Sequence, residues 1–149
     1  MITYLDNCCY NRSFDDQKQR RIYLETLAII RIQKKIMEGE IELATSFILD
    51  YENRSSPYEE QRIKIEDFYR SYSKVYIGVE HADRLRELAE KIIAEGIKEK
   101  DAYHVASAIL AQCDFFITVD DRLLKYRSDD ITLINPIDFV KIWGEKDDG

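Results

Sequence analysis

The chain has 149 residues, and we expect one domain over 1–149 with a polar tail from about residue 145. Its 45% hydrophobic residues, with only 5 Gly and 2 Pro, exclude a disordered or fibrous chain. The 22 Lys and Arg against 29 Asp and Glu give a net charge of -7, which argues against a protein that coats nucleic acid by long-range attraction. A local acidic site that binds metal is compatible with this charge.

Hydrophobic segments and cysteines indicate the cellular setting. No stretch approaches the ~18–20 apolar residues of a membrane-spanning helix, and the N-terminus lacks a basic stretch followed by an apolar signal core. We therefore expect a cytoplasmic protein with no membrane segment. Three cysteines, two of them adjacent, and two histidines do not suit a disulfide framework or a structural zinc site.

The first part of the chain predicts two strands with a long helix between them. Residues 2–5 form a β-prone run that ends in Asp6, and residues 41–45 predict a second strand. Apolar side chains recur at helical spacing from about residue 15 to residue 38, and Gly39 ends the predicted helix. The apolar positions of this helix are Leu24, Leu27, Ala28, Ile32 and Ile36.

The next segment predicts two helices and a third strand. Thr45 or Ser46 can cap a helix that contains residues 47–52. A polar stretch around residues 63–70 predicts a second helix, and residues 73–78 predict a strand.

The second half begins with two amphipathic helices. One covers residues 85–93 and stops at Gly96, and the other has Asp101 in its first turn. The buried positions of the second helix are Ala102, Val105, Ala106, Ile109, Leu110 and Cys113. The almost wholly apolar run 115–119 predicts a strand at the centre of a parallel sheet.

The chain ends with a short helix around residues 123–124, a strand at 131–134 and a helix at 136–143, followed by a tail that we expect to fray. Strands that alternate with helices indicate an α/β fold. We expect a three-layer α/β/α domain with a mainly parallel central sheet.

Four acidic residues are expected to meet at one edge of this sheet. Asp6 and Asp120 each follow a predicted strand, and the carboxyl ends of parallel strands form the ligand-binding edge. Glu52 lies in the helix that leaves the second strand, and Asp101 begins the helix that leads to the strand before Asp120. We expect these four side chains to line one crevice.

Such a cluster needs a cation. Two carboxylates ~5 Å apart repel by roughly 3 kcal/mol at an effective dielectric constant near 20. Mg²⁺ or Mn²⁺ removes this repulsion and can hold a phosphodiester and activate water. An alternative interpretation makes these acids helix caps or solvated turn residues. The chain has no Gly-rich phosphate loop, no Asp-x-Asp after the first strand and no G-x-S-x-G motif.

Four segments together resemble the PIN-domain family over nearly the whole chain. They are Tyr4-Leu5-Asp6-Asn7, Ile48-Leu49-Asp50-Tyr51-Glu52, Lys100-Asp101-Ala102-Tyr103-His104-Val105-Ala106-Ser107-Ala108 and Phe116-Ile117-Thr118-Val119-Asp120. The resemblance implies an α/β/α fold and metal-dependent ribonuclease activity, prominently that of VapC-like toxins of bacterial and archaeal toxin–antitoxin pairs. The chain departs from the family at Asn7 and Cys8, where Ser or Thr and then Asn are common. Asp50 competes with Glu52 as the second acid.

The resemblance also implies roles and partners. Asp6, Asp101 and Asp120 would ligate Mg²⁺ or Mn²⁺, and Glu52 would bind the ion through water or orient the attacking water. The products would carry a 3′-hydroxyl and a 5′-phosphate. The implied partners are an RNA substrate, a small antitoxin protein and a second copy of the chain in a homodimer.

Several neighbouring residues have two interpretations. Thr118 either donates a hydrogen bond to a site carboxylate or is an ordinary strand residue. We interpret His104 as a buried, hydrogen-bonded histidine, Asp121 as the cap of the next helix, and Cys8 and Cys9 as small packing residues.

The first helix and the tyrosines offer candidate RNA contacts. Arg12, Arg20 and Arg21 line either an RNA path or a solvated face. The ten tyrosines either stack on unpaired bases or form the rim of the core.

Two other functions stay open. One is a PIN-like binding or scaffold module without catalysis, and the other is a stand-alone RNA or DNA nuclease. The presence of all four acids favours an enzyme, because a binding module has no reason to retain their repulsion.

Overall fold

Within residues 1–148, which the computed structural model describes, five parallel strands form one sheet in the order β3-β2-β1-β4-β5. The strands are β1 (Ile2–Leu5), β2 (Glu42–Ser46), β3 (Ser73–Ile77), β4 (Phe115–Ile117) and β5 (Thr132–Ile134). The predicted three-layer α/β/α class with a parallel sheet is confirmed.

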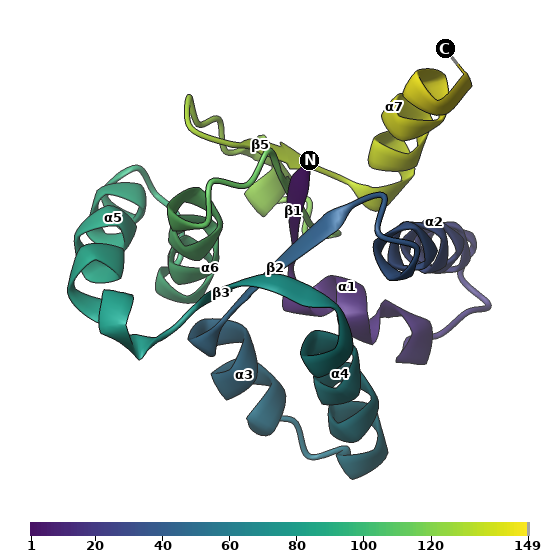
Figure 1. Cartoon of the computed structure of the whole chain (residues 1–149), viewed down its shortest axis with the longest axis horizontal. Helices are drawn as coiled ribbons and strands as arrows, with labels where there is room; N and C mark the ends of the chain where they lie inside the picture. Colours follow the sequence, from purple (N-terminus) through teal and green to yellow (C-terminus); the bar gives the residue numbers. More distant parts are fainter. Residues whose placement is uncertain (149) are drawn as a thin grey trace.

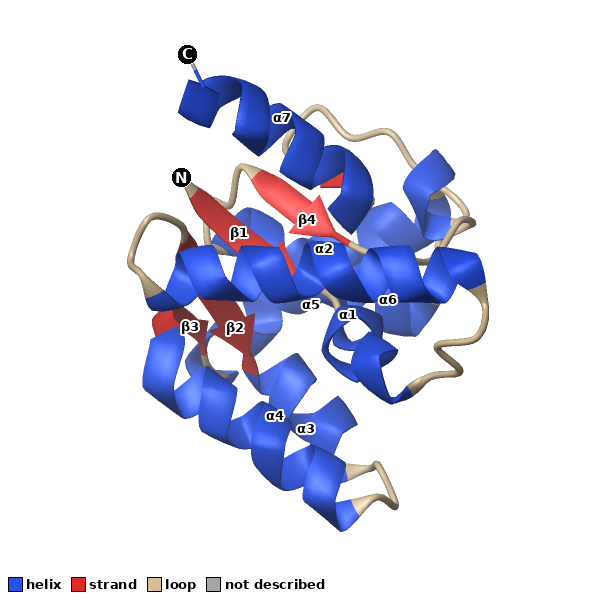
Figure 2. Cartoon of the chain, turned by 90° about the vertical axis from the view of Figure 1, so that its right-hand side faces the viewer, coloured by secondary structure: helices blue, strands red, loops and turns tan. Residues whose placement is uncertain are grey.

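The helices cover both faces of this sheet. They are α1 (Asn7–Asn11), α2 (Arg20–Met37), α3 (Phe47–Arg54), α4 (Glu59–Tyr72), α5 (Ala82–Ala94), α6 (Glu99–Leu110) and α7 (Pro136–Asp148), with short 3-10 turns η1 (Arg12–Phe14), η2 (Val79–His81) and η3 (Leu123–Lys125). Helices α2 and α7 pack together on one side, and α5 and α6 pack together on the other (Figures 1 and 2). None of these helices combines the length and hydrophobicity that a membrane crossing requires.

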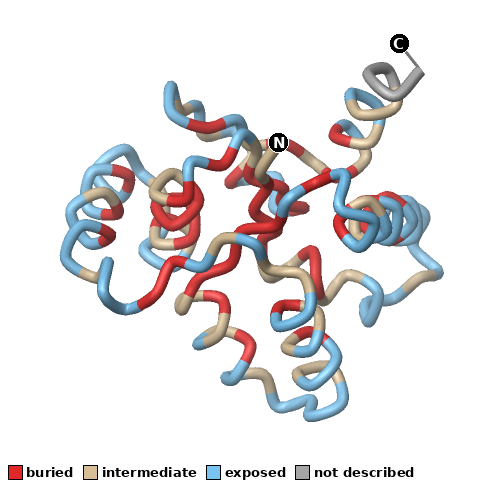
Figure 3. Tube along the Cα trace, in the orientation of Figure 1, coloured by how far each residue is buried: buried red, intermediate tan, exposed pale blue. Residues whose placement is uncertain are grey.

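The core lies along the inner strands, as Figure 3 shows. Tyr4 and Leu5 of β1 and Phe116 and Ile117 of β4 are all fully buried. The rings of Tyr4 and Phe116 stack with their centroids 5.4 Å apart. These strands have helices on both faces, which explains why the run through β4 is almost continuously apolar.

The predicted helix over residues 15–38 is correct in kind but wrong at its start. Of its predicted apolar positions, Ala28, Ile32 and Ile36 are buried. The chain first forms α1 and η1, and α2 begins only at Arg20. The Asp16 carboxylate accepts a hydrogen bond from the Lys18 N–H, which favours a turn over a helix there. Leu24 and Leu27 are 41% and 46% exposed, whereas Glu25 is completely buried.

Helix ends in the first half and at α5 follow the predicted signals. Gly39 after α2 and Gly96 after α5 have φ angles of 81° and 101°, a conformation that glycine adopts without steric cost. Of the two predicted caps for α3, Ser46 performs the role, because its hydroxyl accepts a hydrogen bond from the Leu49 N–H at 3.2 Å.

Other boundaries differ from the prediction. Helix α4 is longer than the polar stretch 63–70, and the strand predicted at 115–119 ends at Ile117. The last helix was predicted to end at residue 143 before a frayed tail, but α7 continues to Asp148. Gly149 lies outside the described residues.

The strand order places a ligand-binding edge beside β1. From β1 the chain builds the sheet in one direction through β2 and β3, and then in the other through β4 and β5. Ligands in open α/β sheets bind outside the carboxyl ends of the strands at such a switch point. The Asp6 N–H donates to the Ile117 carbonyl at 2.9 Å, which joins the ends of β1 and β4.

Candidate active site

Asp6 follows β1 directly and is held by three donors. Its Oδ1 accepts a hydrogen bond from the Asn7 N–H at 2.9 Å, and its Oδ2 accepts from the Thr118 hydroxyl at 2.8 Å and from the Cys8 thiol at 3.4 Å. Asp6 is only 6% exposed. These bonds fix its orientation although the residues after it depart from the family pattern. The interpretation of Thr118 as a donor to a site carboxylate agrees with this geometry.

Asp120 follows β4 and is fixed by the backbone around it. Its N–H donates to the Thr118 hydroxyl at 3.1 Å, and its Oδ1 accepts from the N–H groups of residues 122 and 123 at 2.9 and 3.2 Å. Asp120 therefore accepts two backbone hydrogen bonds at the start of η3, whose N-cap residue is Arg122, and the interpretation of Asp121 as that cap is wrong. Asp121 instead forms a bidentate ion pair with Arg21, with both contacts at 2.6 Å.

Asp101, in the first turn of α6, is surrounded by like charge. Burial raises the pKa of Asp101, and the negative charges of Asp6, Asp120 and Glu52 raise it further against the opposing effect of His104. Asp6, Asp120 and Glu52 therefore all lie near enough to Asp101 for their charges to act on it.

Glu52 lies on α3, and both of its oxygens are engaged from α6. Lys100 Nζ lies 2.9 Å from Oε1, and His104 Nε2 lies 2.5 Å from Oε2. Burial alone would raise the pKa of Glu52, but the hydrogen bonds and charges of His104 and Lys100 outweigh it and hold that pKa below its ordinary value. Glu52 is therefore ionised at neutral pH.

His104 is supported from inside the protein. It is 1% exposed, and its Nδ1 lies 2.8 Å from the Tyr4 hydroxyl, which lies 2.7 Å from the Ser46 hydroxyl. The interpretation of His104 as a buried, hydrogen-bonded histidine agrees with these contacts. The chain Ser46–Tyr4–His104 links the strand ends to Glu52.

Asp50, the competitor of Glu52, has a different environment. Its carboxylate accepts a hydrogen bond from the Tyr76 hydroxyl at 2.7 Å. Asp50 lines a separate cavity of about 330 Å³ together with residues of α4 and β3. The geometry favours Glu52 as the acid that acts with the other three.

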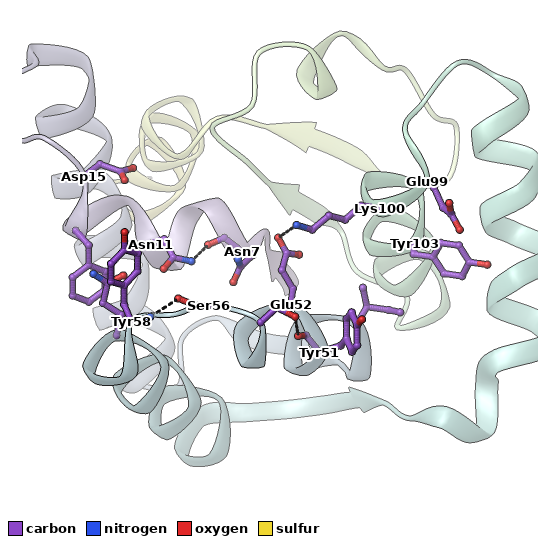
Figure 4. A pocket seen from close by; sticks show the side chains of 14 residues that line it. Asn7, Asn11, Asp15, Tyr51, Glu52, Ser56, Tyr58, Glu99, Lys100 and Tyr103 are labelled. Carbon is purple, nitrogen blue, oxygen red and sulfur yellow. Dashed lines mark hydrogen bonds and ion pairs between the residues drawn. The ribbon is translucent and has the colours of Figure 1, made fainter.

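A larger cavity of about 1160 Å³ reaches Glu52 and Lys100 from one side. We call it the side groove. It is lined by Asn7, Asn11, Phe14, Asp15, Ile48, Tyr51, Glu52, Ser55, Ser56, Tyr58, Gln61, Glu99, Lys100 and Tyr103. Figure 4 shows Lys100 extending to Glu52. Tyr51 belongs to α3, and Tyr58 belongs to the loop that follows it.

The donor set suits a hard divalent cation. Among the side chains of residues 1–144, no three His, Cys, Asp or Glu already stand as a direct ligand set. The four carboxylates nevertheless supply only oxygen donors, and the pKa of Asp101 is raised by burial and then by the negative charges of Asp6, Asp120 and Glu52. Mg²⁺ keeps several of its waters, so it needs few direct protein ligands. Asp6, Asp101 and Asp120 are the candidates to hold such an ion, with Glu52 beside them.

The sequence analysis missed the contact of Lys100 with Glu52 and the burial of Glu25 between two arginines. Lys100 and His104 are four residues apart in α6, and this spacing, which places both on one helical face, was a usable signal. Of the arginines considered for an RNA path, Arg12 and Arg21 form ion pairs with Glu25, at 2.7 and 3.4 Å. Arg20 is exposed, as a solvated face requires.

Comparisons with known proteins identify the family and the fold. The family model described as PIN domain matches residues 3–128. No curated protein matches the chain significantly.

Solved structures share the fold at low sequence identity. VapBC2 from Rickettsia felis, bound to a DNA fragment from its promoter, is 19% identical with a TM-score of 0.55, and the match covers 91% of this chain and 98% of that one. FitAcB from Neisseria gonorrhoeae is 15% identical with a TM-score of 0.53 and the same coverages. FitAB bound to an IR36 DNA fragment is 16% identical with a TM-score of 0.57, covering 92% of this chain and 96% of that one.

Proposed function

Since the chain belongs to the PIN domain family, we propose that it is a metal-dependent endoribonuclease and the toxin of a toxin–antitoxin pair. The observation that carries the proposal is the environment of Asp101. A half-buried carboxylate among three other acids destabilises a protein unless a cation joins them, and phosphodiester hydrolysis is chemistry that such a cation supports.

Each residue of the candidate site has its own proposed role. Asp6, Asp101 and Asp120 would hold Mg²⁺ or Mn²⁺, and Thr118 keeps the Asp6 carboxylate in place. When bound, the cation would polarise the phosphodiester and lower the pKa of water. Glu52, ionised at neutral pH, would orient the attacking water or contact the ion through water. The water oxygen bonds to phosphorus and the bond to the 3′ oxygen breaks, which leaves a 5′-phosphate and a 3′-hydroxyl.

The structural neighbours support the proposed antitoxin partner, whereas the homodimer and the location are proposed from the sequence. VapBC2 and FitAB are structures of toxin–antitoxin complexes, and two of the three matched structures contain DNA. We propose a small antitoxin as the partner of this chain, a homodimer as its assembly and the cytoplasm as its location. A neighbouring short reading frame that encodes a DNA-binding protein would support the antitoxin.

The test is cleavage of a labelled single-stranded RNA by the purified chain with Mn²⁺. We expect the Asp6→Asn variant to lose cleavage and the Thr118→Val variant to lose ~10- to 100-fold, because Thr118 orients a metal ligand. Asp83→Asn is the matched control, since the Asp83 side chain is 98% exposed on α5. Circular dichroism checks that each variant folds.

Each outcome separates the alternatives. Cleavage that persists in a folded Asp6→Asn protein contradicts the proposal. Cleavage of the corresponding DNA strand but not of RNA indicates a DNA nuclease. A wild-type chain that binds Mn²⁺ without cleaving either strand indicates a binding module.

A further inference from the structure

The side groove begins at the acidic site and leads away from it. Glu52 and Lys100 are part of its lining, and so is Asn7, the residue after Asp6. A strand whose phosphate lies at the four acids therefore has a cavity of about 1160 Å³ next to its scissile bond. Figure 4 shows side chains from α1, α3, the loop after α3 and α6 around this space.

Aromatic rings along the groove are unusually exposed. Tyr51 and Tyr58 are 75% and 62% exposed, and Phe14 is 39% exposed. They come from α3, the loop that follows it and η1. Tyr103 of α6 adds a fourth ring to the lining. Clustered exposed rings of this size indicate a binding surface, because the fold gains little stability from them.

The charges of the groove disfavour two other occupants. Of its acids, Asp15 is paired with Arg12 at 3.1 Å and Glu52 with Lys100 at 2.9 Å. A basic peptide segment therefore finds few unpaired acids to bind. A run of phosphates finds Lys100 as the single cation in the lining, and that cation is already engaged.

The polar groups of the groove are of the kind that bind base edges. Asn7, Asn11 and Gln61 contribute side-chain amides.

We propose that the side groove binds unpaired bases of the RNA strand next to the scissile phosphate, with Tyr51 and Tyr58 stacking on them. The strand's phosphates stay in solvent outside the groove. Double-helical RNA keeps its bases stacked inside and does not fit. This inference rests on the proposed ribonuclease function.

The experiment measures binding separately from cleavage. A fluorescein-labelled single-stranded RNA is titrated with the Asp6→Asn protein, and anisotropy gives Kd. We expect Tyr51→Ala and Tyr58→Ala, each added to this background, to raise Kd by ~5- to 10-fold, because each removes a stacking partner. Tyr51→Phe and Tyr58→Phe keep the ring and should leave Kd within ~2-fold.

Tyr23 provides the matched control, because it is 49% exposed but lies on α2 outside the groove lining. We expect Tyr23→Ala to leave Kd unchanged. RNA strands that lack one base at a time then locate the contact. Where a base stacks on Tyr58, the effects on Kd of deleting the base and of Tyr58→Ala should be non-additive.

The results distinguish a failure of the proposed function from a failure of the inference about the groove. A wild-type chain that neither binds nor cleaves RNA overturns both the function and this inference. RNA that is cleaved normally, with Kd unchanged in both alanine variants or with additive effects at every position, overturns the inference alone. Alanine variants that weaken only the binding of an antitoxin assign the groove to that protein and also overturn it.

Discussion

Glu25 and Asp101 show two opposite ways of placing a carboxylate inside this protein. Glu25 is completely buried, and it accepts hydrogen bonds from Arg12 at 2.7 and 3.0 Å, from Arg21 at 3.4 Å and from Asn135 at 2.7 Å. Asp101 is only half-buried, and like charges surround it. Hydrogen bonds and opposite charges therefore stabilise the ionised Glu25, whereas burial and like charges destabilise the ionised Asp101.

The hydrogen-bond network of Glu25 also supports the loop that carries Asp120. Besides contacting Glu25, Arg21 donates to the Val119 carbonyl at 3.3 Å and binds Asp121. These two residues flank Asp120. The Glu25 network therefore anchors the loop that presents one of the site acids, and the stability of α2 helps to position the proposed chemistry.

The largest expected effect is at Glu25. Glu25→Gln removes the buried charge that Arg12 and Arg21 share, and Arg12 is only 18% exposed, so we expect a loss of about 3 kcal/mol in the free energy of unfolding. Urea denaturation measures it. Glu38→Gln, at a residue 42% exposed, should change stability by less than about 0.5 kcal/mol. Equal unfolding midpoints for the two variants would show that the Glu25 network does not stabilise the fold.

A smaller loss is expected at Tyr4, which lies buried between Ser46 and His104. Tyr4→Phe keeps the stacked ring but removes the hydroxyl that contacts Ser46 and His104. Because both partners stay buried, we expect a loss of about 1–2 kcal/mol in thermal or urea unfolding. Tyr58→Phe, at a residue 62% exposed, is the control and should change stability little. A neutral Tyr4→Phe variant would mean that this hydroxyl does not support His104.

The smallest expected effect is that of Asp101→Asn, which should raise the free energy of unfolding rather than lower it. The folded pKa of Asp101 lies above 3.8, so the free energy of unfolding falls as pH rises through that folded pKa. In EDTA at neutral pH we expect the variant to be more stable by about 0.5–1 kcal/mol, a modest gain because water screens a half-buried group. The gain should vanish well below pH 3.8, where the carboxyl is protonated in both states. If the difference in stability between variant and wild type were independent of pH, charge repulsion would not be its cause.

The sequence predicted what depends on local pattern. Alternating apolar runs and helical periodicity gave the α/β/α class, and Gly39 and Gly96 marked helix ends through the positive φ they adopt. The four acids were identified because each lies at a strand end or a helix that leads from one. Their separate roles at the site stay predictions.

The sequence could not predict what depends on distant partners. Glu25 breaks the apolar pattern of α2, and its burial requires Asn135, which lies 110 residues away in the chain. The same pattern assigned Leu24 and Leu27 to the core, although both are exposed. Asp121 seemed a helix cap because its partner Arg21 lies on another element.

The most direct test of the central claim is calorimetric titration of Mn²⁺ into the wild-type chain and into Asp6→Asn, Asp101→Asn and Asp120→Asn, with Asp83→Asn as the matched control. If these acids share a cation, the wild type and the control bind Mn²⁺ alike, and each of the other three variants binds it at least ~10-fold more weakly. Equal Mn²⁺ affinity in all five proteins would contradict the account.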